Sequence, residues 1–110
     1  MTIDRANAET ARPVKVGPMT YTVMNVEDLR QGDQSLDGCC KNSTCEIFLD
    51  AGLCDQAARV TLWHEIMHVI LMQAGLCEVM TEQLCEVMAH GVMGVLEDNP
   101  WLGERPPRGA

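Results

Sequence analysis

Apolar and polar residues alternate in the first half of the chain and recur at helical spacing in the second half. Residues 20–26 (TYTVMNV) alternate and are rich in β-branched side chains, which predicts a strand. Residues 45–49 (CEIFL) predict a second short strand, and the Gly- and Asp-rich segment 31–38 before it predicts a loop. Because such a loop joins the two strands, we expect them to form an antiparallel pair.

The segment 55–73 has the apolar spacing of a helix. Apolar residues occupy most sides of this helix, and a helix of that kind is normally buried. Asp55 is the expected N-cap, and Gly75 suits the C-terminal cap.

A second helix is predicted at 81–97. Thr81 suits its N-cap, and the pair Asn99–Pro100 stops it. The order strand, strand, helix, helix predicts a small α+β fold, in which an antiparallel strand pair or sheet packs on the buried helix and on the second helix. The apolar stripe of the second helix consists of Leu84, Val87, Met88, Gly91, Val92 and Val95.

The size and composition of the chain are those of a single domain. The 110 residues are 46% hydrophobic but only 4% aromatic, so the core is expected to be aliphatic and rich in Met. We place the domain at residues 20–102. The polar residues 1–19 predict a flexible N-terminal arm, and residues 103–110, rich in Pro and Gly, predict a flexible C-terminal tail.

Eight basic residues against sixteen acidic residues give a net charge of −8. No nucleic-acid partner is expected, because neutralising phosphates requires clustered Lys and Arg. The longest apolar stretch, around 66–72, is interrupted by His68 and is too short to span a bilayer. The polar N-terminus lacks the apolar segment of a signal peptide, so we expect a cytoplasmic protein without a membrane partner.

The six cysteines favour reduced thiols, because nothing in the sequence directs the chain to an oxidising compartment. Cys77 and Cys85 lie among apolar residues and are interpreted as core residues. Cys39, Cys40 and Cys45 lie together in a polar segment, where one or two disulfides or a second metal site are the alternatives.

The predicted buried helix contains the motif His64-Glu65-Ile66-Met67-His68. His64 and His68 are four residues apart, so both imidazoles leave the same helix face and can bind one zinc ion. Glu65 lies about 100° round the helix, near the open side of the metal, where it can take a proton from water. Burying three polar groups without a metal is unfavourable, so we favour a zinc site over histidines satisfied within the core.

A catalytic zinc site needs a third protein ligand and an open fourth position. Position 74, six residues after His68, is Ala, which excludes the metzincin pattern with its third His. The second helix offers Glu82, Glu86 and His90 on one face. Four residues advance about 6 Å along a helix, so we expect one of the three to bind metal and the others to orient ligands or stabilise an oxyanion. A solvated acidic face is the alternative interpretation of this row.

Three segments share the pattern of one family: 61–68 (TLWHEIMH), 82–89 (EQLCEVMA) and the helix end at 99–100. Over about residues 20–102 the chain resembles the ImmA/IrrE-type metallopeptidases, in the compact form that phages and prophages encode. The resemblance implies a zincin-like fold and Glu82 as the third zinc ligand. It also implies that the protein acts in the cytoplasm of a bacterial or phage-infected host cell.

The predicted function is zinc-dependent hydrolysis of peptide bonds in an intracellular protein, with Glu65 as the general base. The alternative is a non-catalytic binding or regulatory module that zinc stabilises. A thiol redox protein is less favoured, because only Lys41 supplies a positive charge near the cysteine cluster. Tyr21 and His90 are candidate oxyanion donors, although Tyr21 also suits a packed strand position. The expected zinc ligands are His64, His68 and Glu82, with Glu86 or His90 as alternatives to Glu82.

Overall fold

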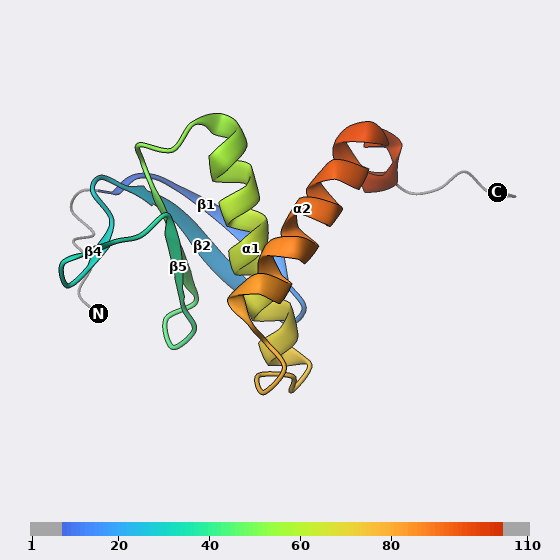
Figure 1. Cartoon of the computed structure of the whole chain (residues 1–110), viewed down its shortest axis with the longest axis horizontal. Coiled ribbons are helices and arrows are strands. Elements are labelled where there is room, and N and C mark those ends of the chain that lie inside the picture. The colour runs from blue at the N-terminus through green and yellow to red at the C-terminus, as the bar shows by residue number, and fades with distance from the viewer. Residues whose placement is uncertain (1–7, 105–110) are drawn as a thin grey trace, which may run out of the picture.

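A four-stranded sheet and two long helices form most of the chain (Figure 1). The computed structural model describes residues 8–104. The α+β class predicted from the sequence is confirmed. In chain order the elements are β1 (Ala8–Val16), β2 (Met19–Val26), β3 (Arg30–Gln31), β4 (Gln34–Ser35), β5 (Gly38–Lys41), β6 (Glu46–Asp50), α1 (Asp55–Gln73), α2 (Glu82–Asp98) and a short 3₁₀ helix, η2 (Pro100–Gly103).

The strands of the larger sheet lie in the order β1-β2-β6-β5, and β3 and β4 form a separate hairpin. β1 is antiparallel to β2, β2 is parallel to β6, and β6 is antiparallel to β5. The predicted antiparallel pairing of the strands at 20–26 and 45–49 was therefore wrong. The reason is β5, at which the sequence pattern predicts no strand. The chain reverses once between β2 and β5 and again between β5 and β6, which leaves β6 parallel to β2.

Part of the predicted flexible arm at 1–19 belongs to the sheet instead. Residues 8–16 form β1 and pair with β2. Val16 is buried in the main core and Val14 packs against it, so apolar contacts hold this strand in place despite its polar neighbours. Gln73 Nε2 also donates a 2.8 Å hydrogen bond to the backbone oxygen of Val16, which ties the strand to the end of α1.

The two ends of the chain, residues 1–7 and 105–110, lie outside the described residues. Most of the tail predicted at 103–110 therefore lies there as well. Gly103 is the last residue of η2.

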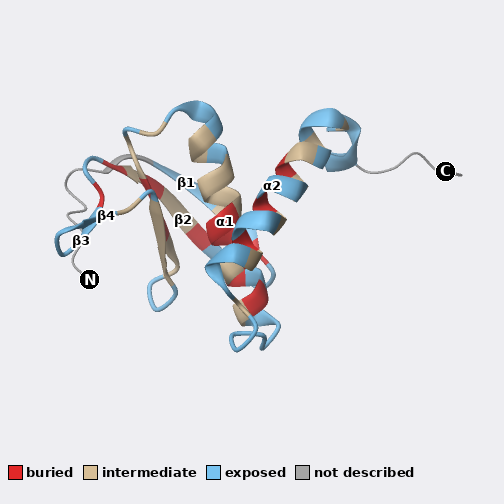
Figure 2. Cartoon of the chain, viewed as in Figure 1, coloured by how far each residue is buried: buried red, intermediate tan, exposed pale blue. Residues whose placement is uncertain are grey.

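α1 packs across one face of the sheet and is the most buried helix of the chain (Figure 2). It begins after Cys54, which makes no side-chain cap. The predicted N-cap Asp55 is instead the first helical residue. There the positive end of the helix dipole stabilises its negatively charged carboxylate. At the other end Gly75, at φ 75°, allows Leu76 N to donate a 2.9 Å hydrogen bond to Leu71 O, as its predicted capping role requires. The main core cluster consists of Val16, Tyr21, Ile47, Leu49, Ile66 and Val69.

The edge strand β5 passes very close to α1 at Gly38. A Cβ atom at this position would lie 2.6 Å from Thr61 Cγ2, so a larger residue would push the strand away from the helix. Gly38 thus allows β5 to lie beside the part of α1 that leads into the histidine motif.

α2 packs on α1 through a second apolar cluster, formed by Met67, Leu71 and Cys85. Thr81 Oγ1 accepts a 3.0 Å hydrogen bond from Leu84 N, which confirms the predicted N-cap. The C-terminal part of α2 and η2 extend away from the sheet (Figure 1). Among the described residues, neither helix combines the length and the hydropathy that a bilayer-spanning segment requires.

Candidate metal centre

The three motif residues lie midway along α1, between the sheet and α2. His64 is 8% exposed and Glu65 is 7% exposed, while His68 is half-buried. The two histidines leave the same helix face, and their ring centroids are 4.9 Å apart. Two ligand-type side chains therefore come from one helix that packs in the core.

Glu82, in the first turn of α2, completes a group of three metal-ligating side chains. Glu82 Oε2 lies 2.8 Å from His64 Nε2, and Glu82 Oε1 lies 2.8 Å from His68 Nε2. The two Nε2 atoms are 3.1 Å apart, and one ligand atom from each residue can be chosen so that all lie within 4.8 Å. Ligand atoms about 2.0–2.1 Å from a tetrahedral zinc ion lie roughly 3.3 Å from one another. The donor atoms are therefore already spaced for one ion.

Glu86 lies one helical turn after Glu82 and contacts the other ring nitrogen of His64. Glu86 Oε2 is 2.6 Å from His64 Nδ1, and Glu86 Oε1 is 3.0 Å from His90 Nε2. If His64 is neutral and donates its Nδ1–H to Glu86, its Nε2 lone pair faces a carboxylate oxygen of Glu82. Two acceptors in contact need a proton or a metal ion between them. A proton shared by His64 and Glu82, or a metal ion bound to both, therefore satisfies this contact.

Burial and charge act on His64 in opposite directions. Burial lowers the pKa of His64, but hydrogen bonds to Glu82 and Glu86 and the nearby negative charge outweigh it, so the pKa is raised. The metal-free ring therefore keeps its proton to a higher pH than an ordinary histidine does. A metal ion must displace that proton, so metal binding is expected to weaken at acidic pH.

Glu65 is a buried carboxylate beside the three donor residues. Burial raises its pKa to about 7, with the charge of Glu82 adding to the rise and His64 opposing it. Within residues 8–104 it forms no hydrogen bond or ion pair with another described residue. A carboxylate in this state can accept and release a proton near neutral pH.

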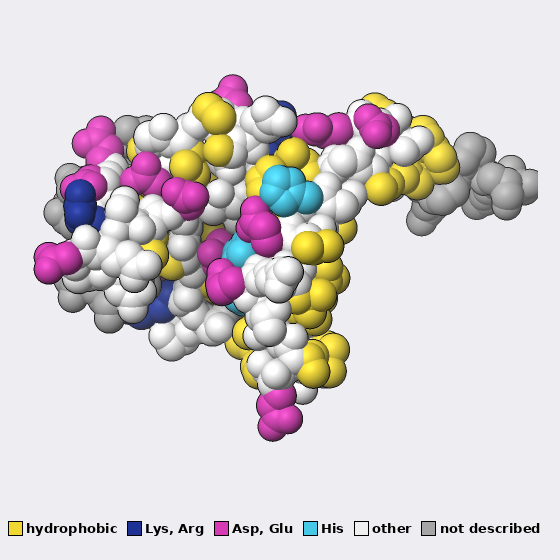
Figure 3. Space-filling model, in the orientation of Figure 1, with side chains coloured by type: hydrophobic (Ala, Val, Ile, Leu, Met, Phe, Trp, Pro, Cys, Tyr) yellow, Lys and Arg dark blue, Asp and Glu magenta, His cyan; other side chains and the backbone are white. Residues whose placement is uncertain are grey.

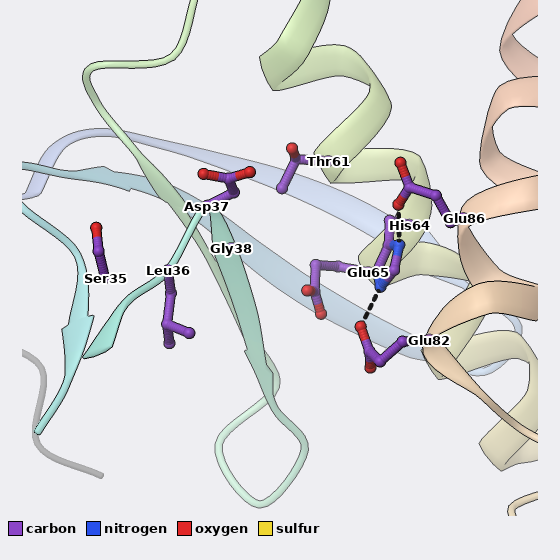
Figure 4. Close-up of a pocket in the computed structure, with 9 residues that line it drawn as sticks. All are labelled: Ser35, Leu36, Asp37, Gly38, Thr61, His64, Glu65, Glu82 and Glu86. Atoms are coloured by element: carbon purple, nitrogen blue, oxygen red, sulfur yellow. Dashed lines mark hydrogen bonds and ion pairs between the residues drawn. The ribbon is translucent and has the colours of Figure 1, made fainter. Parts of the chain in front are cut away.

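Three adjoining cavities open along this side of α1. The central cavity, of about 350 Å³, is lined by residues of the loop before β5, of α1 and of α2 (Figure 4). A cavity of about 510 Å³ adjoins it at Glu65 and Glu82 and extends along β5. A third, of about 350 Å³, adjoins it at Asp37, Thr61 and Glu86 and lies between α1 and α2. Together they form one groove with the donor residues on its wall.

The three alternatives for the third ligand occupy separate places. Glu82 contacts both Nε2 atoms, Glu86 contacts the Nδ1 atom of His64, and His90 contacts Glu86 with its side chain 60% exposed. Tyr21 is 1% exposed in the main core and donates a 2.9 Å hydrogen bond to Asn42 Oδ1. It is a packed strand residue and lines none of the three cavities.

Asp37 and Thr61 also line the central cavity, although neither belongs to a sequence motif that predicts a site. Thr61 lies one helical turn before Glu65 on α1, so helical periodicity could have found it. Asp37 comes from the loop before β5, and no local pattern in the sequence places that loop beside α1.

Two of the cysteines in the groove, Cys39 and Cys40, have raised pKa values. All six cysteines of the chain are free, and Cys39 and Cys40 line the cavity along β5. Burial, together with the charge of Glu65, raises the pKa of Cys39 to about 11 and that of Cys40 to about 12. Such thiols are weak nucleophiles and weak metal ligands. Within residues 8–104, the group that can hold a metal ion is His64, His68 and Glu82.

Comparisons of the chain with protein-family models, with curated proteins and with solved structures find no match. The geometry of the site is therefore the basis on which a function is proposed.

Proposed function

We propose that this chain is a zinc-dependent metallopeptidase that hydrolyses peptide bonds of an intracellular protein substrate. The observation that carries the proposal is Glu65, a buried carboxylate with a pKa raised to about 7. It lies beside three converging donor residues and on the wall of an open cavity. A purely structural metal site has no use for such a base, because protein ligands fill its coordination sphere.

His64, His68 and Glu82 are the residues that would hold the metal. Two imidazoles and one carboxylate match the donor set of catalytic zinc sites, which keep one position open. Zinc held there supplies a Lewis acid that polarises a carbonyl and makes water a better nucleophile. Glu86 lies 2.6 Å from His64 Nδ1, and as the acceptor of its N–H it would select the tautomer whose Nε2 binds the metal.

Glu65 takes a proton from the attacking water and delivers it to the leaving amine nitrogen. Its burial makes the carboxylate a stronger base than an exposed glutamate, while a pKa of about 7 leaves it partly ionised at neutral pH. The groove gives an extended peptide access to this carboxylate.

The sequence motifs that resemble ImmA/IrrE-type metallopeptidases support the same reaction. We extend the proposal to a compact protein of that kind, acting in the cytoplasm of a bacterial or phage-infected cell.

The test compares wild type with Glu65→Gln, both loaded with zinc in reducing buffer. We expect about one zinc per chain in both proteins, and a loss of about a hundredfold or more in the rate at which the variant cleaves a quenched fluorescent peptide library. Glu78→Gln, on the exposed turn before α2, removes the same charge outside the groove and should leave both measurements unchanged.

Two results would contradict the peptidase proposal. Equal cleavage by wild type and Glu65→Gln would show that another group is the base. Full zinc binding without cleavage by any of the proteins would favour the zinc-stabilised binding module instead.

A further inference from the structure

The groove along α1 is acidic. Asp37, Glu65, Glu82 and Glu86 line its central cavity, and among the described residues no Lys or Arg lines any of the three cavities. In Figure 3 acidic side chains surround the histidines, and the Lys and Arg side chains in view lie towards the edges of the molecule. Four carboxylates outweigh the two charges of one zinc ion, so the groove keeps a negative potential when metal is bound.

Asp37 is the carboxylate that the proposed reaction does not use. Its backbone oxygen accepts a 2.8 Å hydrogen bond from Asp50 N, which fixes the residue just before β5. Its side chain is exposed and lines both the central cavity and the cavity between α1 and α2. Figure 4 shows its carboxylate at the end of the pocket away from Glu82. Within the described part of the chain it has no ion-pair partner.

The other carboxylates of the cavity are already engaged or buried. Glu82 contacts both histidines of the motif, and Glu86 bridges His64 and His90. Glu65 is 7% exposed, has no hydrogen-bond partner among the described residues and lines the same cavity. A side chain this buried, whose carboxylate has no partner among the described residues and is open to the cavity, indicates that the cavity receives a polar ligand. Asp37 is the exposed carboxylate of the cavity that has no ion-pair partner among the described residues, so it is available to a positive charge.

We propose that Asp37 forms the subsite for a basic side chain, so that preferred substrates carry Lys or Arg close to the scissile peptide bond. The inference rests on the proposed peptidase function and names its substrate class. A carboxylate without a competing cation binds an ammonium or guanidinium group through charge-assisted hydrogen bonds. Val60 and Met93 line the adjoining cavity with Asp37, and such apolar side chains suit the methylene stem of Lys or Arg.

The cleavage experiment uses quenched fluorescent peptide libraries with one position fixed as Lys, Arg, Gln or Glu. Zinc-loaded wild type should cleave the Lys and Arg libraries about tenfold faster than the Glu library, since a carboxylate there is repelled. Asp37→Asn should reduce the preference for Lys over Gln by about two- to fivefold, as expected for one solvent-exposed ion pair. Asp37→Lys should reverse the preference towards Glu.

Asp33→Asn is the matched control. Asp33 is an exposed acidic residue in the turn between β3 and β4, and it lines none of the three cavities. Its variant loses the same charge and should keep the wild-type preference. An equal loss of preference in Asp33→Asn and Asp37→Asn would overturn the subsite. The preference for Lys would then come from the overall negative charge of the molecule.

A binding measurement separates this inference from the peptidase proposal. Fluorescein-labelled octapeptides with Lys or Gln at each position in turn are titrated into zinc-loaded Glu65→Gln, with and without Asp37→Asn, and followed by anisotropy. A Lys preference that disappears with Asp37→Asn supports the subsite even if wild type cleaves nothing. Cleavage whose sequence preference is unchanged by Asp37→Asn overturns the subsite and leaves the peptidase standing. The absence of both cleavage and Lys-dependent binding overturns both.

Discussion

α1 and α2 contribute to the same candidate site but are held in place in different ways. α1 lies between the sheet and α2, and its His64 and Glu65 are almost completely buried. α2 packs on the rest of the domain through α1, and the side chain of its Glu82 is 80% exposed. One half of the site therefore lies on a helix packed between the sheet and α2, and the other half depends on the docking of α2 on α1.

This difference matters for how the site is assembled. The packing of α1 on the sheet holds the backbone that carries both imidazoles, whose rings lie on the same helix face. The carboxylate of Glu82 reaches them only while Met67, Leu71 and Cys85 hold the two helices together. Variants of the two helices should therefore act on the metal site by different routes.

The largest expected effect is the loss of metal binding when the ligands of α1 are removed. The double variant His64→Ala/His68→Ala should bind no zinc above background. Glu82→Gln should bind zinc much more weakly than wild type does. Glu86→Gln should lose about 10–100-fold in zinc affinity. The grading follows from the geometry, since Glu82 contacts both Nε2 atoms whereas Glu86 only orients His64. Competition with a chromophoric chelator in reducing buffer measures the affinities.

The double histidine variant also controls for the six cysteines, because thiols can bind zinc independently of the histidines. Zinc that remains in the double histidine variant would place the metal elsewhere. Equal affinities for Glu82→Gln and Glu86→Gln would remove the distinction between ligand and orienting residue.

A smaller effect is expected when the docking of α2 is weakened. Leu71→Ala truncates a residue that is 8% exposed in the cluster between the helices, and should lower the free energy of unfolding by about 2–5 kcal/mol. Val87→Ala changes a residue of α2 that is 64% exposed and should alter stability by about 0.5 kcal/mol or less. Urea unfolding of the metal-free proteins gives both values. Zinc affinity should fall for Leu71→Ala but not for Val87→Ala. An unchanged zinc affinity of Leu71→Ala would show that the docking of α2 does not position Glu82.

The smallest effect concerns the pH dependence of the metal-free protein. The pKa of Glu65 is raised from 4.5 to about 7, so between these values the folded chain binds more protons than the unfolded chain. Stability should therefore fall as pH rises from about 5 to 8, by roughly 2–3 kcal/mol. The raised pKa of His64 acts in the same direction, since its bound proton is also lost as pH rises.

Glu65→Gln should remove most of this dependence of stability on pH. We expect the dependence that remains to come from His64. Urea midpoints of chelator-treated proteins at several pH values provide the measurement. A stability that increases with pH in wild type would mean that the Glu65 carboxylate is not destabilised by its burial.

Local patterns located the helices and the histidine motif but not the arrangement of the sheet. Features that depend on residues within one or two helical turns can be predicted from the sequence. They include the caps at Thr81 and Gly75 and the spacing of His64 and His68. β5 is short, contains Gly38 and two cysteines, and becomes a strand only by pairing with β6. Its order in the sheet is a property of the whole fold.

The candidate site likewise combines features that local spacing predicts with features that only the fold decides. Helical spacing placed Glu82, Glu86 and His90 on one face, but the choice between them depends on how α2 rests against α1. Asp37 reaches the groove only because β5 passes close to α1 at Gly38. Contacts between distant parts of the chain decide both outcomes.

The donor residues lie on both sides of the turn that joins α1 to α2. A metal ion that needs all three binds the docked chain and not the unfolded one, so the binding free energy adds to the stability of the domain. At a free metal concentration one hundred times the Kd, the addition is about 2.7 kcal/mol. Scarcity of the metal would remove this contribution, raise the unfolded fraction and make the chain a better target for degradation. The lifetime of the protein in a cell would then follow the supply of its metal.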